Sequence, residues 1–104
     1  MNRFALCLST TLLVVTPFAA HANKGLAEKN GCLGCHAVAA KLVGPAYKDV
    51  AAKYAGQPDA TEMLAKSIRA GGTGKWGEMA MPPQAQLSEA DAKKLAAWIL
   101  GGAK

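Results

Sequence analysis

Several signatures of catalysis and nucleic-acid binding are missing from this 104-residue sequence. It contains no Ser-His-Asp triad pattern, no phosphate-binding glycine loop and no paired catalytic carboxylates, so no enzyme class is indicated. The lysines are spread along the chain without interleaved aromatic residues, which argues against nucleic-acid binding. Internal repeats and the apolar–polar alternation typical of strands are also lacking. These absences favour an all-α protein that is not an enzyme.

Cysteine and histidine are scarce, with three and two copies, yet most of them gather in one motif, C-x-x-C-H at residues 32–36. This motif is the attachment sequence of a c-type haem. Two thiols three positions apart lie on one face of a helical turn, where each can bond one vinyl group of the same porphyrin. His36 follows directly, and its imidazole can reach the iron. We therefore predict one covalent haem c on Cys32 and Cys35.

Three other uses of the cysteine pair have less support. A thioredoxin-type redox pair requires a nearby βαβ pattern, which is absent. A structural zinc site needs four ligands, often from a second C-x-x-C or a histidine pair. A disulfide between Cys32 and Cys35 would close a very small loop and stabilise the fold little.

Residues 1–22 have the composition of a secretory signal peptide. Arg3 supplies the initial positive charge, an apolar stretch follows, and Ala20-His21-Ala22 forms an A-x-A cleavage site. The apolar run is short for a membrane span and no stop-transfer pattern follows it; an uncleaved anchor is the alternative. We predict export, cleavage after Ala22, and a mature domain of residues 23–104 without stable membrane insertion.

Removal of this segment changes the inventory of reactive residues. Cys32, Cys35 and His36 become the only cysteines and histidine, so no structural disulfide can form once haem is attached. Loss of Arg3 reduces the 12 basic residues to 11, against 7 acidic ones. This mild positive charge suits an acidic partner or a membrane surface. A chain this short buries a limited core, which a covalently bound apolar disc would help to stabilise.

Apolar periodicity and terminal residues predict about four short helices around the haem. They are expected over residues 23–34, 46–55, 59–70 and 88–100, with the first ending near residues 34–37 and delivering His36. Asp59 with Glu62 suggests a capping box, and Ser88 is the predicted cap of the last helix. Two apolar sets are expected in the core. The second helix contributes Tyr47, Val50, Ala51 and Tyr54. The last helix contributes Leu95, Trp98 and Ile99, and this face is expected to cross the first helix near Ala27. Met63 is also expected in the core.

Residues 72–86 form a long predicted loop containing Trp76, Met79 and Met81, and such a loop in a small domain is usually functional. Without a second histidine, the iron needs another soft neutral ligand, and methionine is the natural choice. Met81 directly precedes Pro82 and Pro83, which restrict the backbone. Met79 has no such restraint, so Met81 is the favoured ligand.

Two further residues are candidates for the site. The Pro45 carbonyl could accept a hydrogen bond from the far imidazole nitrogen, although Pro45 also suits an ordinary helix start. The Trp76 indole could donate to a haem propionate, or the ring could serve only in packing.

Five segments in order resemble the small bacterial class I cytochromes c of the c-551/c-552 group: C-x-x-C-H at 32–36, V-G-P-A-Y at 43–47, K-D-V-A-A-K-Y-A-G at 48–56, W-G at 76–77 and M-P-P at 81–83. The likeness covers essentially all of residues 23–104. It implies a class I cytochrome c fold and a monomeric, periplasmic one-electron carrier in respiration. It also implies transient docking of redox-partner proteins, such as a nitrite reductase or terminal oxidase, at an exposed haem edge.

The resemblance further implies a role for each matching residue. Cys32 and Cys35 bond the haem, His36 and Met81 bind iron, Pro45 accepts from His36, and Trp76 donates to a propionate. Two positions depart from the relatives. Ser67 stands where an arginine often lies near a propionate, with Arg69 two residues on, and Gln84 replaces an asparagine that contacts the methionine sulfur. An open sixth position, as in a gas-binding domain or an enzyme, is the alternative that the methionine-bearing loop disfavours.

Overall fold

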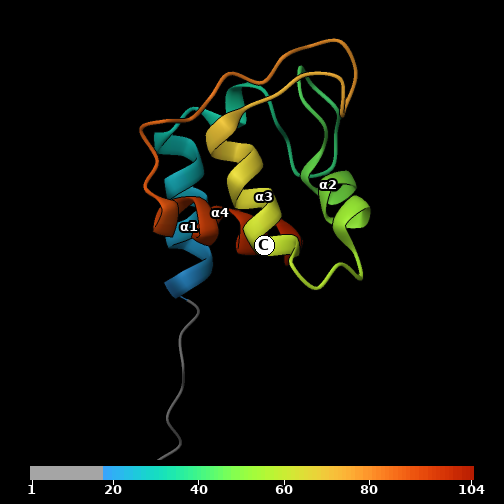
Figure 1. Ribbon diagram of the computed structural model, residues 1–104. Helices are drawn as coiled ribbons and strands as arrows, with labels where there is room; N and C mark the ends of the chain where they lie inside the picture. The colour runs from blue at the N-terminus through green and yellow to red at the C-terminus, as the bar shows by residue number, and fades with distance from the viewer. Residues whose placement is uncertain (1–17) are drawn as a thin grey trace, which may run out of the picture.

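The computed structural model describes residues 18–104 as helices joined by irregular loops (Figure 1). The elements are α1 (Phe18–Lys29), a 3-10 turn η1 (Cys32–Gly34), α2 (Tyr47–Tyr54), α3 (Ala60–Ala70) and α4 (Glu89–Leu100). Within this range there is no strand, and one isolated antiparallel bridge joins Gly72 to Met81. The predicted all-α class with four helices is confirmed.

Residues 1–17, with most of the predicted signal peptide, lie outside the described part. Helix α1 begins at Phe18, before the predicted cleavage point after Ala22. None of the helices in the described part is long and apolar enough to cross a membrane. Cleavage after Ala22 therefore stays a prediction.

Helix α4 is the centre of the fold, because α1, α2 and α3 all pack against it. It begins as predicted: the Ser88 hydroxyl accepts from the backbone N–H of Asp91 at 3.0 Å, which satisfies a donor of the first turn. Its predicted apolar face is buried through Leu95, Trp98 and Ile99. Ala27 of α1 is fully buried, in agreement with the predicted crossing at a small residue.

Helix α2 also follows its apolar pattern. Tyr47, Val50 and Tyr54 are buried along one face, which confirms three of the four predicted core residues. Ala51, the fourth, is only half-buried. The helix ends before Gly56, whose positive φ of 79° is readily adopted only by glycine.

The predicted end of the first helix was wrong. Helix α1 stops at Lys29, because the Asn30 side-chain amide also donates to Leu26 O, the Gly31 N–H donates to Glu28 O in a tighter turn, and Gly31 takes a left-handed φ of 72°. A left-handed glycine is a common helix terminator. The C-x-x-C-H motif therefore starts on the separate turn η1 rather than on a continuing helix.

Two predictions on α3 were also wrong in detail, although the helix itself lies where expected. Asp59 occupies the N-cap position, but its backbone is not extended and its side chain makes no capping hydrogen bond. Met63 is 43% exposed rather than buried. The face of α3 turned toward the core carries Leu64, Ala65 and Ile68, and Met63 lies outside it.

Residues 35–46 and 71–88 are the two long connections, and they lie at the same end of the molecule (Figure 1). The first leads from η1 to α2, and the second arches from α3 to α4. This arrangement places the cysteine–histidine motif and the methionine-bearing loop together at one end of the helical core.

Candidate cofactor site

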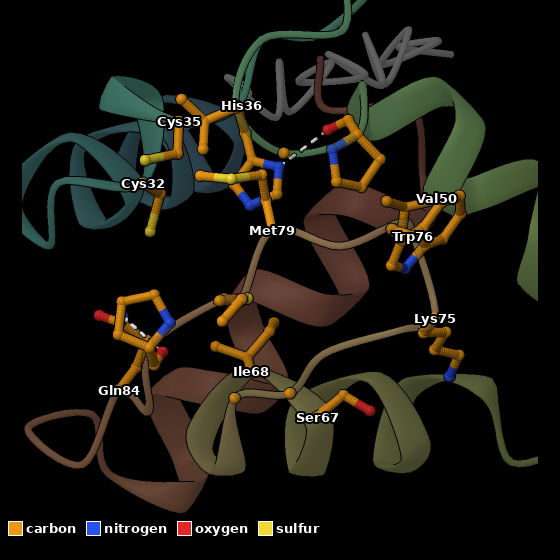
Figure 2. A pocket seen from close by; sticks show the side chains of 18 of the residues that line it. Cys32, Cys35, His36, Val50, Ser67, Ile68, Lys75, Trp76, Met79 and Gln84 are labelled. Carbon is orange, nitrogen blue, oxygen red and sulfur yellow. Dashed lines mark hydrogen bonds between the residues drawn. The ribbon is translucent and has the colours of Figure 1, made fainter.

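A cavity lies between these two loops and the helices beneath them (Figure 2). Its lining includes all six residues predicted to hold the haem: Cys32, Cys35, His36, Pro45, Trp76 and Met81. Its walls also include apolar core side chains: Val50, Leu64, Ile68, Leu95 and Ile99. Segments more than thirty residues apart in the sequence thus supply one predominantly apolar site with a few polar and sulfur-bearing groups.

The turn η1 places the motif at the cavity wall. Cys32 O accepts from the backbone N–H of Cys35 at 3.2 Å and from that of His36 at 2.9 Å, which closes a tight turn. Cys32 is half-buried and Cys35 is exposed, and both are free thiols. Burial raises the pKa of the Cys32 thiol. Figure 2 shows the side chains of Cys32, Cys35 and His36 together at one side of the cavity.

The His36 imidazole is held from three directions. Its Nδ1 lies 2.8 Å from Pro45 O, and because a carbonyl can only accept, Nδ1 carries the proton. With Nδ1 committed to Pro45, Nε2 is the ring nitrogen left to bind a metal. Tyr47 stacks on the ring at 5.3 Å between centroids and 17° between planes. On Gly44, an added Cβ would lie 2.4 Å from His36 Cε1, so only glycine permits this approach.

Tyr47 connects this ring to the helical core. Its ring meets Trp98 of α4 edge-on at 5.5 Å, and the Trp98 indole donates to Lys104 O at 3.1 Å. Burial raises the pKa of Tyr47 well above its usual value, so the phenol stays neutral over the physiological range. The side of the cavity that carries His36 is therefore anchored to α4 by packed aromatic rings.

On the opposite loop, the backbone of Met81 is fixed. Its N–H donates to Gly72 O at 2.8 Å, and its carbonyl accepts from Gly72 N–H at 3.0 Å. Gly71, with φ of 66°, lies so close that an added Cβ would be 2.5 Å from Met81 O. Met81 is half-buried against the core, whereas Met79 is 68% exposed, although both line the cavity.

The two positions that depart from the relatives differ in what they contribute. Ser67 lines the cavity, whereas Arg69 does not and instead donates from Nε to Leu87 O at 3.1 Å. Gln84 lines the cavity, but its side-chain amide donates to Pro82 O at 3.0 Å. Gln84 therefore braces the loop after Met81, and its amide oxygen accepts from the Gln86 side chain at 2.7 Å.

This set of groups fits a haem c. The turn carries two thiols for thioether bonds, the imidazole offers a free Nε2, and a thioether side chain lies on the facing loop within largely apolar walls. A haem held between these walls would cover the apolar side chains that line the cavity, and it would thereby add to the limited core of a small chain.

Comparison with known proteins gives consistent matches. The sequence model of the family described as Cytochrome c matches residues 20–103. Cytochrome c-552 of Nitrosomonas europaea is 54% identical over 92 residues, 88% of each chain. Cytochrome c-551 of Allochromatium vinosum is 50% identical over 94 residues, which cover 90% of this chain and 99% of that one. The crystal structure of N. europaea cytochrome c552 aligns with a TM-score of 0.72 at 55% identity, covering 74% of this chain and 95% of that chain.

Proposed function

Because this chain belongs to the cytochrome c family and carries one covalent haem c, we propose that it is a periplasmic one-electron carrier with iron bound by His36 and Met81. It is an electron-carrying cytochrome with a class I fold, and it is not an enzyme. The observation that carries the ligand proposal is one cavity lined by both His36, with its Nε2 free, and the fixed residue Met81. When bound, the haem iron takes up and gives back a single electron.

The remaining site residues have supporting roles in this proposal. Cys32 and Cys35 form the thioethers, Pro45 fixes the tautomer of His36, and Trp76 donates its indole N–H to a propionate. Within residues 18–104 the Trp76 indole has no protein acceptor, which leaves this donor available.

Both ligands are restrained by backbone contacts. His36 is held by Pro45 and by packing on Gly44, and Met81 is held by paired hydrogen bonds to Gly72. Ligands locked by their surroundings keep their positions when the charge at the site changes. This restraint suits electron transfer, which needs a closed site with little rearrangement, better than gas binding, which needs an open position.

Covalent attachment and export predict a specific mature product. Acid acetone should leave the haem with the polypeptide, because both thioethers survive denaturation. Mass measurement of a periplasmic preparation should give a chain beginning at Asn23 plus one haem. Release of the haem would reject the thioether assignment, and an intact chain beginning at Met1 would reject the cleaved signal peptide.

Apolar side chains are exposed on the surface beside the cavity. Leu42 and Val43 are each 49% exposed and Met79 is 68% exposed, with Leu33 half-buried beside the motif. Lys41 and Lys75, both exposed, lie in the same loops. We propose that the protein is a monomer and that this patch contacts partners briefly, while the lysines steer acidic surfaces toward it. A nitrite reductase or a terminal oxidase is a suitable partner to test.

Steering by charge predicts a salt dependence. Electron transfer to an acidic partner should slow as ionic strength rises from about 0.01 to 0.15 M, because the Debye length falls from roughly 30 to 8 Å. Stopped-flow oxidation of the reduced protein measures this rate. The same experiment with a small neutral oxidant is the control. A partner rate independent of salt would remove the steering and leave only the apolar contact.

A further inference from the structure

Two lysines converge at one edge of the cavity, where α2 meets the loop after α3. Lys75 Nζ donates to the phenol oxygen of Tyr54 at 2.5 Å and lies 4.7 Å from the centre of its ring. Lys53 Nζ donates to Lys75 O at 3.1 Å and lies 4.4 Å from the centre of the Trp76 ring. Figure 2 shows Lys75 and Trp76 at this edge, with Ser67 of α3 nearby.

Neither ammonium has a carboxylate partner from the chain. In the described residues the single ion pair joins Lys94 to Asp91, at 3.7 Å, and residues 1–22 contain no Asp or Glu. Like charges that lie near each other repel, and an anion beside them offsets this repulsion. Their position at one edge of a cofactor cavity is therefore suited to an anionic group of the cofactor.

Other elements around this edge supply no competing charge. Helix α3 contributes neutral Ser67 to the cavity, and α4 contributes only Leu95 and Ile99. Arg69 is turned toward Leu87 and lies outside the lining. Lys75 is thus the ammonium that lines this edge, and Lys53 and Tyr54 of α2 lie behind the lining in contact with Lys75 and Trp76.

We infer that Lys75, oriented by Tyr54, is the charge partner of a haem propionate carboxylate. An ammonium has three donors, so one bond to the Tyr54 oxygen leaves two for a carboxylate. Lys75 then supplies from the loop the positive charge that Ser67 does not supply from α3. The inference rests on the covalent haem c of the family and is independent of which methionine binds iron.

The protonation behaviour of Tyr54 agrees with this arrangement. Burial alone would raise the pKa of Tyr54, but the hydrogen bond from Lys75, the nearby Ser67 hydroxyl and the charges of both lysines outweigh it and lower that pKa. The phenol oxygen is therefore used as an acceptor for a charged ammonium. Tyr54 is a positioning residue, because it acts through Lys75.

Lys75→Met tests the inference in the haem-loaded protein. With ¹³C-labelled propionates, an NMR pH titration should show one carboxyl pKa rising by about one pH unit in the variant, since an adjacent cation favours the ionised form. The midpoint potential falls as a propionate ionises, because a negative charge stabilises ferric iron. In the variant this fall should therefore move to higher pH by the same interval.

Matched variants separate local from general effects. Lys93→Met removes the same charge from an exposed residue of α4 that does not line the cavity, and it should leave both titrations unchanged. Tyr54→Phe should raise the carboxyl pKa by less than Lys75→Met does. Adding Ser67→Arg to Lys75→Met should restore the low value, because residue 67 lines the same cavity.

Two results would overturn the inference. An unchanged propionate pKa in Lys75→Met, with intact iron ligation, would show that Lys75 is not the partner and would leave the proposed function standing. An equal shift in Lys93→Met would show that only the net charge matters. A wild-type spectrum without histidine–methionine ligation would instead count against the proposed function.

Discussion

Met81→Ala should abolish the weak far-red charge-transfer band that thioether ligation gives to ferric haem. It should also lower the midpoint potential by roughly 100 mV or more, a fraction of the ~0.8 V that axial ligands span. The reduced variant should bind carbon monoxide, because the sixth coordination position would be open. Absorption spectroscopy, redox titration and carbon monoxide binding measure the three effects.

The choice of Met81 rests on its backbone. Paired hydrogen bonds to Gly72 hold its peptide groups, and Pro82 and Pro83 restrict the residues that follow. Gly71 packs against its carbonyl at a distance that excludes a side chain. A ligand on a fixed backbone loses less conformational entropy when its sulfur binds iron.

Met79→Ala is the matched control, because it removes the same side chain from the same loop. Met79 is 68% exposed and its backbone is not part of the bridge. The far-red band, the potential and the resistance to carbon monoxide should all persist in this variant. If the band instead vanishes in Met79→Ala and survives in Met81→Ala, Met79 is the ligand and the loop binds iron in a different register.

Local signals account for the parts of the fold that the sequence predicted well. Helix α4 has a serine cap, a periodic apolar face and a double-glycine end, and each of these acts within a few residues. The C-x-x-C-H motif is equally local. The helix end at Gly31 is also a local signal. The prediction missed it, because the helix was assumed to continue into the haem motif that follows.

Other features depend on contacts between distant segments. Met63 has the hydrophobicity of a core residue, but the position of α4 decides which face of α3 is buried. The approach of Lys75 to Tyr54 joins residues 21 positions apart and follows no sequence period. Such contacts require the tertiary structure, because neither residue type nor spacing distinguishes these lysines from the solvated ones.

Gly44 is a further residue whose importance appears only in three dimensions. The sequence indicates merely that it precedes Pro45, a position with restricted backbone angles. In the structure, the His36 ring lies directly over its Cα hydrogens, where an added Cβ would come within 2.4 Å of Cε1 and 2.8 Å of Nδ1. Movement of the ring away from residue 44 is restricted, because Pro45 O binds its Nδ1 and Tyr47 stacks on it.

Gly44→Ala should therefore destabilise the haem-loaded protein by about 1–3 kcal/mol, the usual cost of overpacking a filled site. Displacement of His36 should also lengthen its bond to Pro45 O and shift the NMR signals of the imidazole. Chemical denaturation followed by circular dichroism measures the stability, and the Nδ1 proton resonance reports on the hydrogen bond.

Gly25→Ala is the control, since an added Cβ there meets nothing within 4 Å and the residue lies in α1. Alanine in a helix is favoured over glycine by about 0.5–1 kcal/mol, so this variant should be as stable as the wild type or more stable. If Gly44→Ala lowers the free energy of unfolding and Gly25→Ala does not, the cost of Gly44→Ala arises at the imidazole. Wild-type stability of Gly44→Ala, with an unshifted Nδ1 proton, would show that the ring does not rest on residue 44 in solution.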